Sequence, residues 1–296
     1  MIDQIRELFK RQAQAWPLLG KGLEGLARAR TRSVRVDWFE VFIRHIPHRM
    51  GSTMAAVDPE WVARRPCFLC AHNLPPEEEG LPFEDFTLYC NPFPIVERHL
   101  TIVHSQHCLQ RIVGQYGTML DLARALPGYF VIYNGPQCGA SAPDHMHFQA
   151  GMRKLFPIER DTAKLSGVTV PNYGRNAFLF RSQDRSALIA QMERAIDLLG
   201  ETTGQPVEPM VNIAAFHERG EWVAYLFPRS KHRPEVFYTG ELTVSPAAID
   251  LCGILTVPVT HDFEKITADV VAALFREVTL PDAQFRGIAH NLESER

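Results

Sequence analysis

One stretch of the chain, residues 129–151, constrains the fold more than any other. It reads YFVIYNGPQCGASAPDHMHFQAG: an apolar strand, an Asn-Gly-Pro turn signal, a loop of small residues and a second apolar segment. His145, His147 and Gln149 lie in that second segment. Alternate side chains of an extended chain share a face, so these three are expected to project together. Two imidazoles and an amide beside a small-residue loop indicate a place where a phosphate is held and attacked.

The elements around this stretch predict the fold class. The patterns predict strands at 86–90, 99–104, 210–216 and 222–227, and helices over 109–123, 187–199 and 262–276. The connection between the apolar strand and the histidine segment is too short for a helical crossover, so the two are expected to pair antiparallel. Gly200 is expected to end the second of these helices, and the last dozen residues are expected to be a polar tail. The chain is therefore predicted to be an α+β domain, with helices against a largely antiparallel sheet.

The composition excludes several classes of partner. Among 296 residues, 31 are Lys or Arg and 34 are Asp or Glu, a net charge of −3 that gives no global reason to bind nucleic acid. No run approaches the roughly 18 apolar residues of a membrane span, and the N-terminal stretch predicts an amphipathic docking helix instead of a signal peptide. The 6 cysteines, two of them in a C-x-x-C, are expected to be reduced thiols in the cytoplasm.

A family resemblance is carried by the central stretch. The pattern His-x-His-x-Gln, with the turn and loop before it, resembles the transferase branch of the histidine-triad superfamily. That branch includes galactose-1-phosphate uridylyltransferase, diadenosine tetraphosphate phosphorylase and GDP-galactose phosphorylase; the hydrolase branch has a third histidine in place of the glutamine. Phe227-Pro228-Arg229, after a Trp-bearing strand, is similar to the C-terminal part of the phosphorylases. The likeness is strongest over residues 66–151, and the whole chain resembles a bacterial group within the branch.

The resemblance implies a covalent mechanism and assigns residues to it. His147 would attack the α-phosphorus of a nucleotide, because a neutral imidazole is a good nucleophile near pH 7 and a tolerable leaving group from phosphorus. Gln149 would donate a hydrogen bond to a phosphate oxygen without changing the charge. The remaining candidates for substrate binding are the loop, whose backbone N–H groups form a small anion nest, and two basic residues: Asn134, Gly139, Ala140, Ser141, Arg229 and Lys231.

A metal site is also predicted. A C-x-x-C plus two histidines is a complete zinc set by residue type, and the resemblance to the uridylyltransferase assigns the ligands as Cys67, Cys70, His107 and His145. The zinc would be structural. His104 competes with His107 for one position, His72 lies close to the cysteines, and a C-x-x-C that only packs remains an alternative.

The sequence therefore predicts a nucleotidyltransferase or phosphorylase that forms a nucleotidyl-histidine. Its substrates would be a nucleoside diphosphate sugar or a dinucleoside polyphosphate, with phosphate or a sugar phosphate as acceptor. The sequence leaves open whether the chain forms a homodimer. Residues 1–55 are expected to be an N-terminal extension packed on the core, 56–160 the catalytic core with its zinc knuckle, and 161–296 a C-terminal part completing the same domain. The alternatives are a zinc-stabilised protein that binds or senses nucleotides without turnover, and a nucleotide hydrolase.

Overall fold

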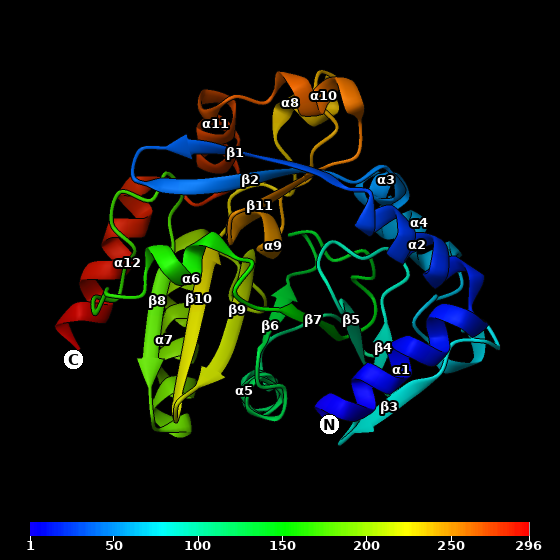
Figure 1. Cartoon of the computed structure of the whole chain (residues 1–296). Helices are drawn as coiled ribbons and strands as arrows, with labels where there is room; N and C mark the ends of the chain where they lie inside the picture. The colour runs from blue at the N-terminus through cyan, green and yellow to red at the C-terminus, as the bar shows by residue number, and fades with distance from the viewer. Residues whose placement is uncertain (296) are drawn as a thin grey trace.

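A large antiparallel sheet organises the computed structural model, which describes residues 1–295 (Figure 1). Its strand order is β3-β4-β5-β7-β6-β9-β10-β8, and each neighbouring pair is antiparallel. The strands are β3 (Gly80–Phe83), β4 (Phe86–Cys90), β5 (Leu100–His104), β6 (Tyr129–Asn134), β7 (His147–Met152), β8 (Phe178–Ser182), β9 (Val211–Glu218) and β10 (Glu221–Pro228). The predicted α+β class with a largely antiparallel sheet is confirmed.

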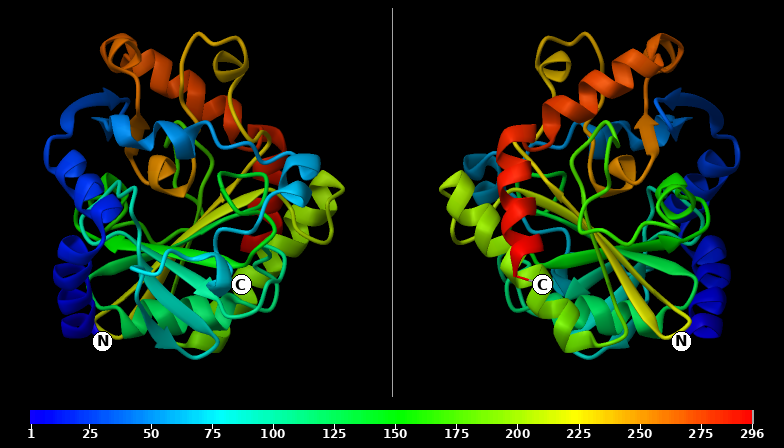
Figure 2. Two further views of the ribbon diagram at one scale, coloured as in Figure 1. Left: turned by 90° about the vertical axis from the view of Figure 1, so that its right-hand side faces the viewer. Right: turned by 90° about the vertical axis from the view of Figure 1, so that its left-hand side faces the viewer.

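A second, smaller sheet joins distant parts of the chain. It consists of β1 (Arg30–Val36), β2 (Phe39–His45) and β11 (Ile254–Val257), with β2 in the middle. β1 and β2 pair antiparallel, whereas β2 and β11 pair parallel, with Phe42 opposite Ile254. Figure 2 shows from two sides that this sheet and the helical segments at 260–278 above it form a separate layer next to the large sheet.

Different elements cover the two faces of the large sheet. They are α1 (Ile2–Ala15), α2 (Pro17–Ala27), α3 (Met50–Thr53), α4 (Pro59–Arg64), α5 (Tyr116–Ala125), α6 (Pro157–Asp161), α7 (Arg185–Thr203), α8 (Glu235–Tyr238), α9 (Ala248–Leu251), α10 (Thr260–Lys265), α11 (Ala268–Val278) and α12 (Asp282–Ser294). Side chains alternate along a strand, so Val131 and Tyr133 enter one core with α1, α5, α7 and α12, while Phe130 and Ile132 enter another with the small sheet and α11. The two cores hold the central strands from both faces.

Several local predictions are confirmed. The strands at 86–90 and 99–104 are β4 and β5, and the hairpin at 210–227 is β9 and β10. β6 and β7 pair antiparallel, as the short connection required. None of the helices in residues 1–295 is long and apolar enough to reach across a bilayer.

Other local predictions are wrong. The helix expected from residue 109 begins only at Tyr116, and Leu109 and Val113 are 57% and 55% exposed in the loop before it. α7 runs past Gly200 to Thr203 and ends at Gly204, whose φ of +69° is a left-handed cap. The helix expected over 262–276 is divided into α10 and α11.

The expected polar tail is also wrong. The last residues form α12, which buries Phe285, Ile288, Ala289 and Leu292 against the core. These four positions follow the i, i+3, i+4, i+7 spacing of an amphipathic helix.

Candidate functional site

The ring of His147, at the start of β7, is held by one hydrogen bond to a backbone carbonyl. Its Nδ1 donates to the carbonyl of His145 at 2.8 Å, which places the proton on Nδ1 because a carbonyl can only accept. Nε2 therefore carries the free lone pair, and it makes no hydrogen bond within residues 1–295. Burial lowers the pKa of His147 to about 4, so the ring is neutral near pH 7. A buried neutral imidazole with a fixed tautomer has the properties required of a nucleophile.

A buried glutamine connects the two halves of the motif. Gln110 is 1% exposed and accepts from the His147 N–H at 2.8 Å. Its own amide group donates to the carbonyls of Asn134 and His147 at 2.9 and 3.0 Å. The end of β6 and the start of β7 are thus fixed relative to each other. The sequence contains no motif for this residue, which follows His107 by three positions.

The orientation of the Gln149 amide is set by His99, which is fully buried. Nδ1 of His99 accepts from the backbone N–H of Ile95 at 3.2 Å, and burial lowers its pKa to about 3, so the neutral ring carries its proton on Nε2. Nε2 donates to Oε1 of Gln149 at 2.8 Å. The amide nitrogen of Gln149 consequently faces the neighbouring cavity as a donor. Sequence reasoning missed His99 because it stood only as the first residue of an expected strand.

The small-residue loop and Asn134 line the same cavity. Oδ1 of Asn134 accepts from Nδ2 of Asn212 at 2.8 Å and from the Ala248 N–H at 3.0 Å, which leaves its amide nitrogen as the remaining donor. Gly139 has a φ of +98°, and a Cβ there would lie 2.5 Å from the Cβ of Ala247, so the position requires glycine. The Ala140 N–H donates to Gly135 at 3.4 Å, whereas within residues 1–295 the N–H groups of Gly139 and Ser141 have no partner.

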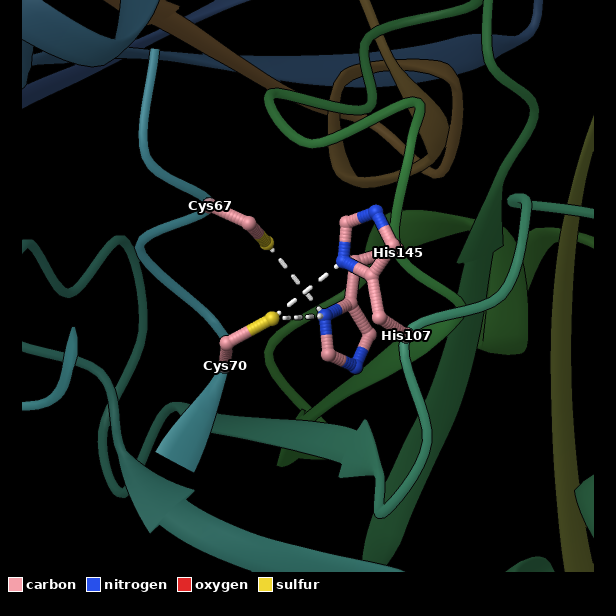
Figure 3. Close-up of side chains that lie close together, drawn as sticks. All are labelled: Cys67, Cys70, His107 and His145. Carbon is pink, nitrogen blue, oxygen red and sulfur yellow. Dashed lines mark hydrogen bonds between the residues drawn. The ribbon is translucent and has the colours of Figure 1, made fainter. Parts of the chain in front are cut away.

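The four predicted metal ligands form one cluster (Figure 3). The donor atoms of Cys67, Cys70, His107 and His145 all lie within 4.8 Å of one another. Sulfur and nitrogen are 3.3 Å apart for Cys67 and His145, 3.2 Å for Cys70 and His107, and 3.6 Å for Cys70 and His145. Tetrahedral zinc, with bonds of about 2.3 Å to sulfur and about 2.0 Å to nitrogen, places such atoms roughly 3.5 Å apart. The donor set and its spacing therefore fit a metal ion.

Neighbouring groups favour the protonation states that let these four residues bind a metal. Nε2 of His145 donates to the carbonyl of His104 at 2.8 Å, so Nδ1 keeps a free lone pair that points into the cluster. The His104 ring instead accepts from the Gln106 N–H at 3.0 Å and takes no part, which decides between His104 and His107. Burial alone would raise the pKa of the Cys67 thiol, but its contact with His145 and the Leu69 backbone N–H lower the pKa to about 6, which favours the thiolate.

The two predicted basic residues occupy different environments. Arg229 is 1% exposed, and its guanidinium donates to Oδ1 of Asn212 and to the carbonyls of Pro246, Val278, Lys231 and His232. It holds the loop after β10 and, through Asn212, the amide of Asn134. Lys231 lies at the surface, where its Nζ pairs with Glu277 at 2.8 Å. Neither side chain lines the cavity next to Gln149.

The antiparallel sheet, the His-x-His-x-Gln strand and the Cys2His2 cluster stand in a chain that is similar to known families. Two family models match consecutive parts of it. Residues 150–294 match the GDPGP1-like C-terminal domain, and residues 8–152 match a domain of unknown function, DUF4922. No curated protein matches the sequence.

Solved structures show the same fold. The yeast Ap4A phosphorylase Apa2 superposes with a TM-score of 0.59 at 16% identity, over 89% of this chain and 97% of that chain. Its complex with AMP gives a TM-score of 0.58 at 17% identity, over 94% and 96%. Its complex with Ap4A gives a TM-score of 0.57 at 18% identity, over 93% of this chain and 97% of that chain. The likeness thus extends over nearly the whole of both chains.

Proposed function

We propose that this chain is a nucleotidyltransferase of the phosphorylase type, with His147 as the nucleophile. The observation that carries the proposal is the geometry of His147: a buried neutral ring whose Nδ1 proton is fixed on the His145 carbonyl, leaving the Nε2 lone pair free. The fold shared with an Ap4A phosphorylase supports it. The donor would be a dinucleoside polyphosphate or a nucleoside diphosphate sugar, and the acceptor a phosphate-bearing molecule.

The reaction would proceed in two displacements at phosphorus. In the first, Nε2 of His147 forms a bond to the α-phosphorus, and the bond from phosphorus to the bridging oxygen breaks, so the leaving phosphate keeps the electron pair. The ring now carries positive charge, which the His145 carbonyl stabilises through Nδ1–H. In the second, an oxygen of the acceptor phosphate attacks the same phosphorus, and the electron pair of the P–N bond returns to Nε2.

The other polar groups would stabilise the charge on the transferring phosphoryl group. Gln149 and Asn134 present amide N–H groups to the cavity, and the Gly139 and Ser141 N–H groups are available beside them. These donors are neutral and preorganised, so they need no rearrangement when charge develops on the phosphate oxygens.

The metal cluster would act by positioning. A bound zinc would hold the side chain of His145, and the carbonyl of this same residue fixes the His147 ring. The site is therefore proposed as structural, although its ligand His145 is only two residues from the nucleophile. Cys67 and Cys70 bring it ligands from the segment before β3.

The test is intact-protein mass spectrometry of the full chain. We would incubate it with nucleoside diphosphate sugars and dinucleoside polyphosphates, with and without inorganic phosphate. The protein should gain the mass of one nucleoside monophosphate with the correct donor, and the adduct should be acid-labile and disappear on addition of acceptor. His147→Ala should fold and bind nucleotide but form no adduct, whereas His290→Ala, an exposed histidine on α12, should behave as the wild type. An adduct that persists in His147→Ala would overturn the assignment.

A further inference from the structure

The large sheet opens between β6 and β7 at the motif. Their ladder ends at the pair of Ile132 and Gln149, although the same register, continued by two residues, would pair Asn134 with His147. Both strands continue beyond this point with their other neighbours, because Asn134 still pairs with β9 and His147 still pairs with β5. The gap therefore lies between the nucleophile and Asn134, and the strands on either side of it are held by regular pairing.

The side chain of Gln110 fills this gap. Its Oε1 accepts from the His147 N–H at 2.8 Å, and its Nε2 donates to the carbonyls of Asn134 and His147 at 2.9 and 3.0 Å. These are three of the four backbone groups that a direct pair of Asn134 and His147 would join. An amide does not fit between strands at the roughly 4.7–4.9 Å spacing of a paired ladder, so β6 and β7 lie further apart here.

The backbone that carries Gln110 is itself anchored to the motif. The N–H of Gln110 donates to the Pro143 carbonyl at 3.2 Å, and the Cys108 carbonyl accepts from the Met146 N–H at 2.7 Å. Gln110 is only 1% exposed. A buried side chain on an anchored backbone has a fixed reach, and the width of the gap is fixed with it.

This width bears on the site because residues facing each other across two strands project to the same side of the sheet. The side chains of His147 and Asn134 therefore stand on one face, on the two sides of the gap, and Asn134 and Gln149 line the cavity there. A nucleophile must come within roughly 3–3.5 Å of the phosphorus it attacks. Asn134 must reach an oxygen of the same phosphoryl group, so the separation of the two strands decides whether both contacts are possible at once.

We propose that Gln110 is a positioning residue: a spacer that holds His147 and Asn134 at the separation that the transferring phosphoryl group requires. The inference rests on the proposed function and deepens it. Gln110 does not line the cavity next to Gln149, and it acts through the backbone of the two residues that it separates.

Two substitutions in the full-length protein test the spacer. Gln110→Met keeps the length of the side chain and removes its three hydrogen bonds, whereas Gln110→Asn keeps the amide on a side chain one carbon shorter. The matched control is Gln106→Met, since Gln106 is exposed in the same segment and its side chain makes no hydrogen bond within residues 1–295. Thermal unfolding and metal content of each variant establish that it is folded.

The first measurement needs no donor. Nuclear magnetic resonance of protein with isotopically labelled histidine follows hydrogen exchange at the His147 amide, which is identified as the signal absent from His147→Ala. Because this amide donates to Gln110, its exchange should be at least about tenfold faster in Gln110→Met. Gln106→Met should leave the exchange rate unchanged.

The second measurement is the rate of nucleotidyl-protein formation over a series of donor concentrations. Misplacing a reacting group by about 1 Å costs roughly 10² in rate, so the rate at saturating donor should fall about a hundredfold in Gln110→Met and at least about tenfold in Gln110→Asn. The donor concentration that gives half the maximal rate should stay within about threefold of the wild type. A role in stability alone would lower the unfolding temperature and leave the saturating rate unchanged.

The outcomes separate the spacer from the mechanism. Wild-type exchange of the His147 amide in folded Gln110→Met, or a saturating rate within about threefold of the wild type in both folded variants, would overturn the spacer and leave His147 as the nucleophile. Where Gln110→Met does not fold, the rate of Gln110→Asn decides. Faster amide exchange in a protein whose wild type forms no adduct with any donor would refute the proposed function, and the positioning role with it.

Discussion

Replacing Gln149 tests whether a preorganised amide donor stabilises the transferring phosphoryl group. In the structure, His99 donates to Oε1 of Gln149 at 2.8 Å, so the amide nitrogen faces the cavity. Gln149→Met keeps the length of the side chain and removes the donor. Loss of one preorganised donor to developing charge costs about 2.7–4 kcal/mol of activation free energy, a factor of about 10²–10³ in rate.

The variant also leaves a buried group without a partner. Nε2–H of His99 loses its acceptor in Gln149→Met, which costs about 1–3 kcal/mol of the free energy of unfolding. Gln149→Glu separates the two effects, because a carboxylate still accepts from His99 but cannot donate to phosphate and adds negative charge. We expect Gln149→Glu to fold with near wild-type stability and to lose at least as much rate as Gln149→Met.

The assay is the rate of nucleotidyl-protein formation, followed by rapid quenching and mass spectrometry with saturating donor. Thermal unfolding and metal content of the same samples measure the integrity of the fold. A Gln149→Met protein that forms the adduct within about threefold of the wild-type rate would refute the role of the amide, since no donor worth 10² in rate could then have been removed.

Three further predictions concern the metal, the glutamine and a buried carboxyl. Protein purified without added metal should contain about one zinc per chain, and Cys67→Ser should lower both zinc content and the unfolding temperature, because a structural zinc contributes to folding; less than a tenth of an equivalent in a folded wild type would contradict the site. Gln149→His should raise the share of nucleotide lost to water, measured as the ratio of hydrolysis to transfer, and an unchanged ratio would mean that the acceptor site decides it. Burial raises the pKa of Glu208 from 4.5 to about 7, so its protonated form stabilises the fold and this contribution is lost as pH rises from about 4.5 through about 7. Relative to Glu208→Gln, the wild type should lose roughly 2–3 kcal/mol of unfolding free energy between pH 4 and pH 8 in denaturant titrations, and parallel pH profiles would contradict this.

The parts of the site that are contiguous in the sequence could be predicted. The motif from Asn134 to Gln149 lies on one turn, one loop and one strand, so its local pattern fixes its arrangement. The metal cluster was predictable by residue type, and the choice of His107 over His104 required the structure, because it depends on the turn at 105–107.

The residues that surround the motif could not be predicted, because tertiary packing brings them there. His99 reaches Gln149 across paired strands, and Arg49 reaches the cavity from the segment after β2. Nothing local distinguishes either residue from an ordinary buried histidine or surface arginine. The wrong helix start at Leu109 has a similar cause: an apolar spacing continued by chance into a loop, where Leu109 and Val113 remain exposed. The prediction of a polar tail failed for another reason. The apolar residues of α12 have helical spacing, but the polar residues between them dominate the composition of this segment.

The parallel pairing of β2 with β11 has a consequence for the order of folding. An isolated hairpin such as β1–β2 is marginal in water, and its partner strand β11 follows only at Ile254–Val257. The edge of β2 therefore stays open until β11 has been made, and an open strand edge is an aggregation hazard. All four residues of the Cys2His2 cluster precede β7, so this cluster can assemble before β11 anchors β2 and the Arg49 turn that follows it. We expect a growing chain to bind its metal before β11 pairs with β2, and a chain cut before residue 254 to keep the Cys2His2 cluster while the turn that carries Arg49 lacks its anchor.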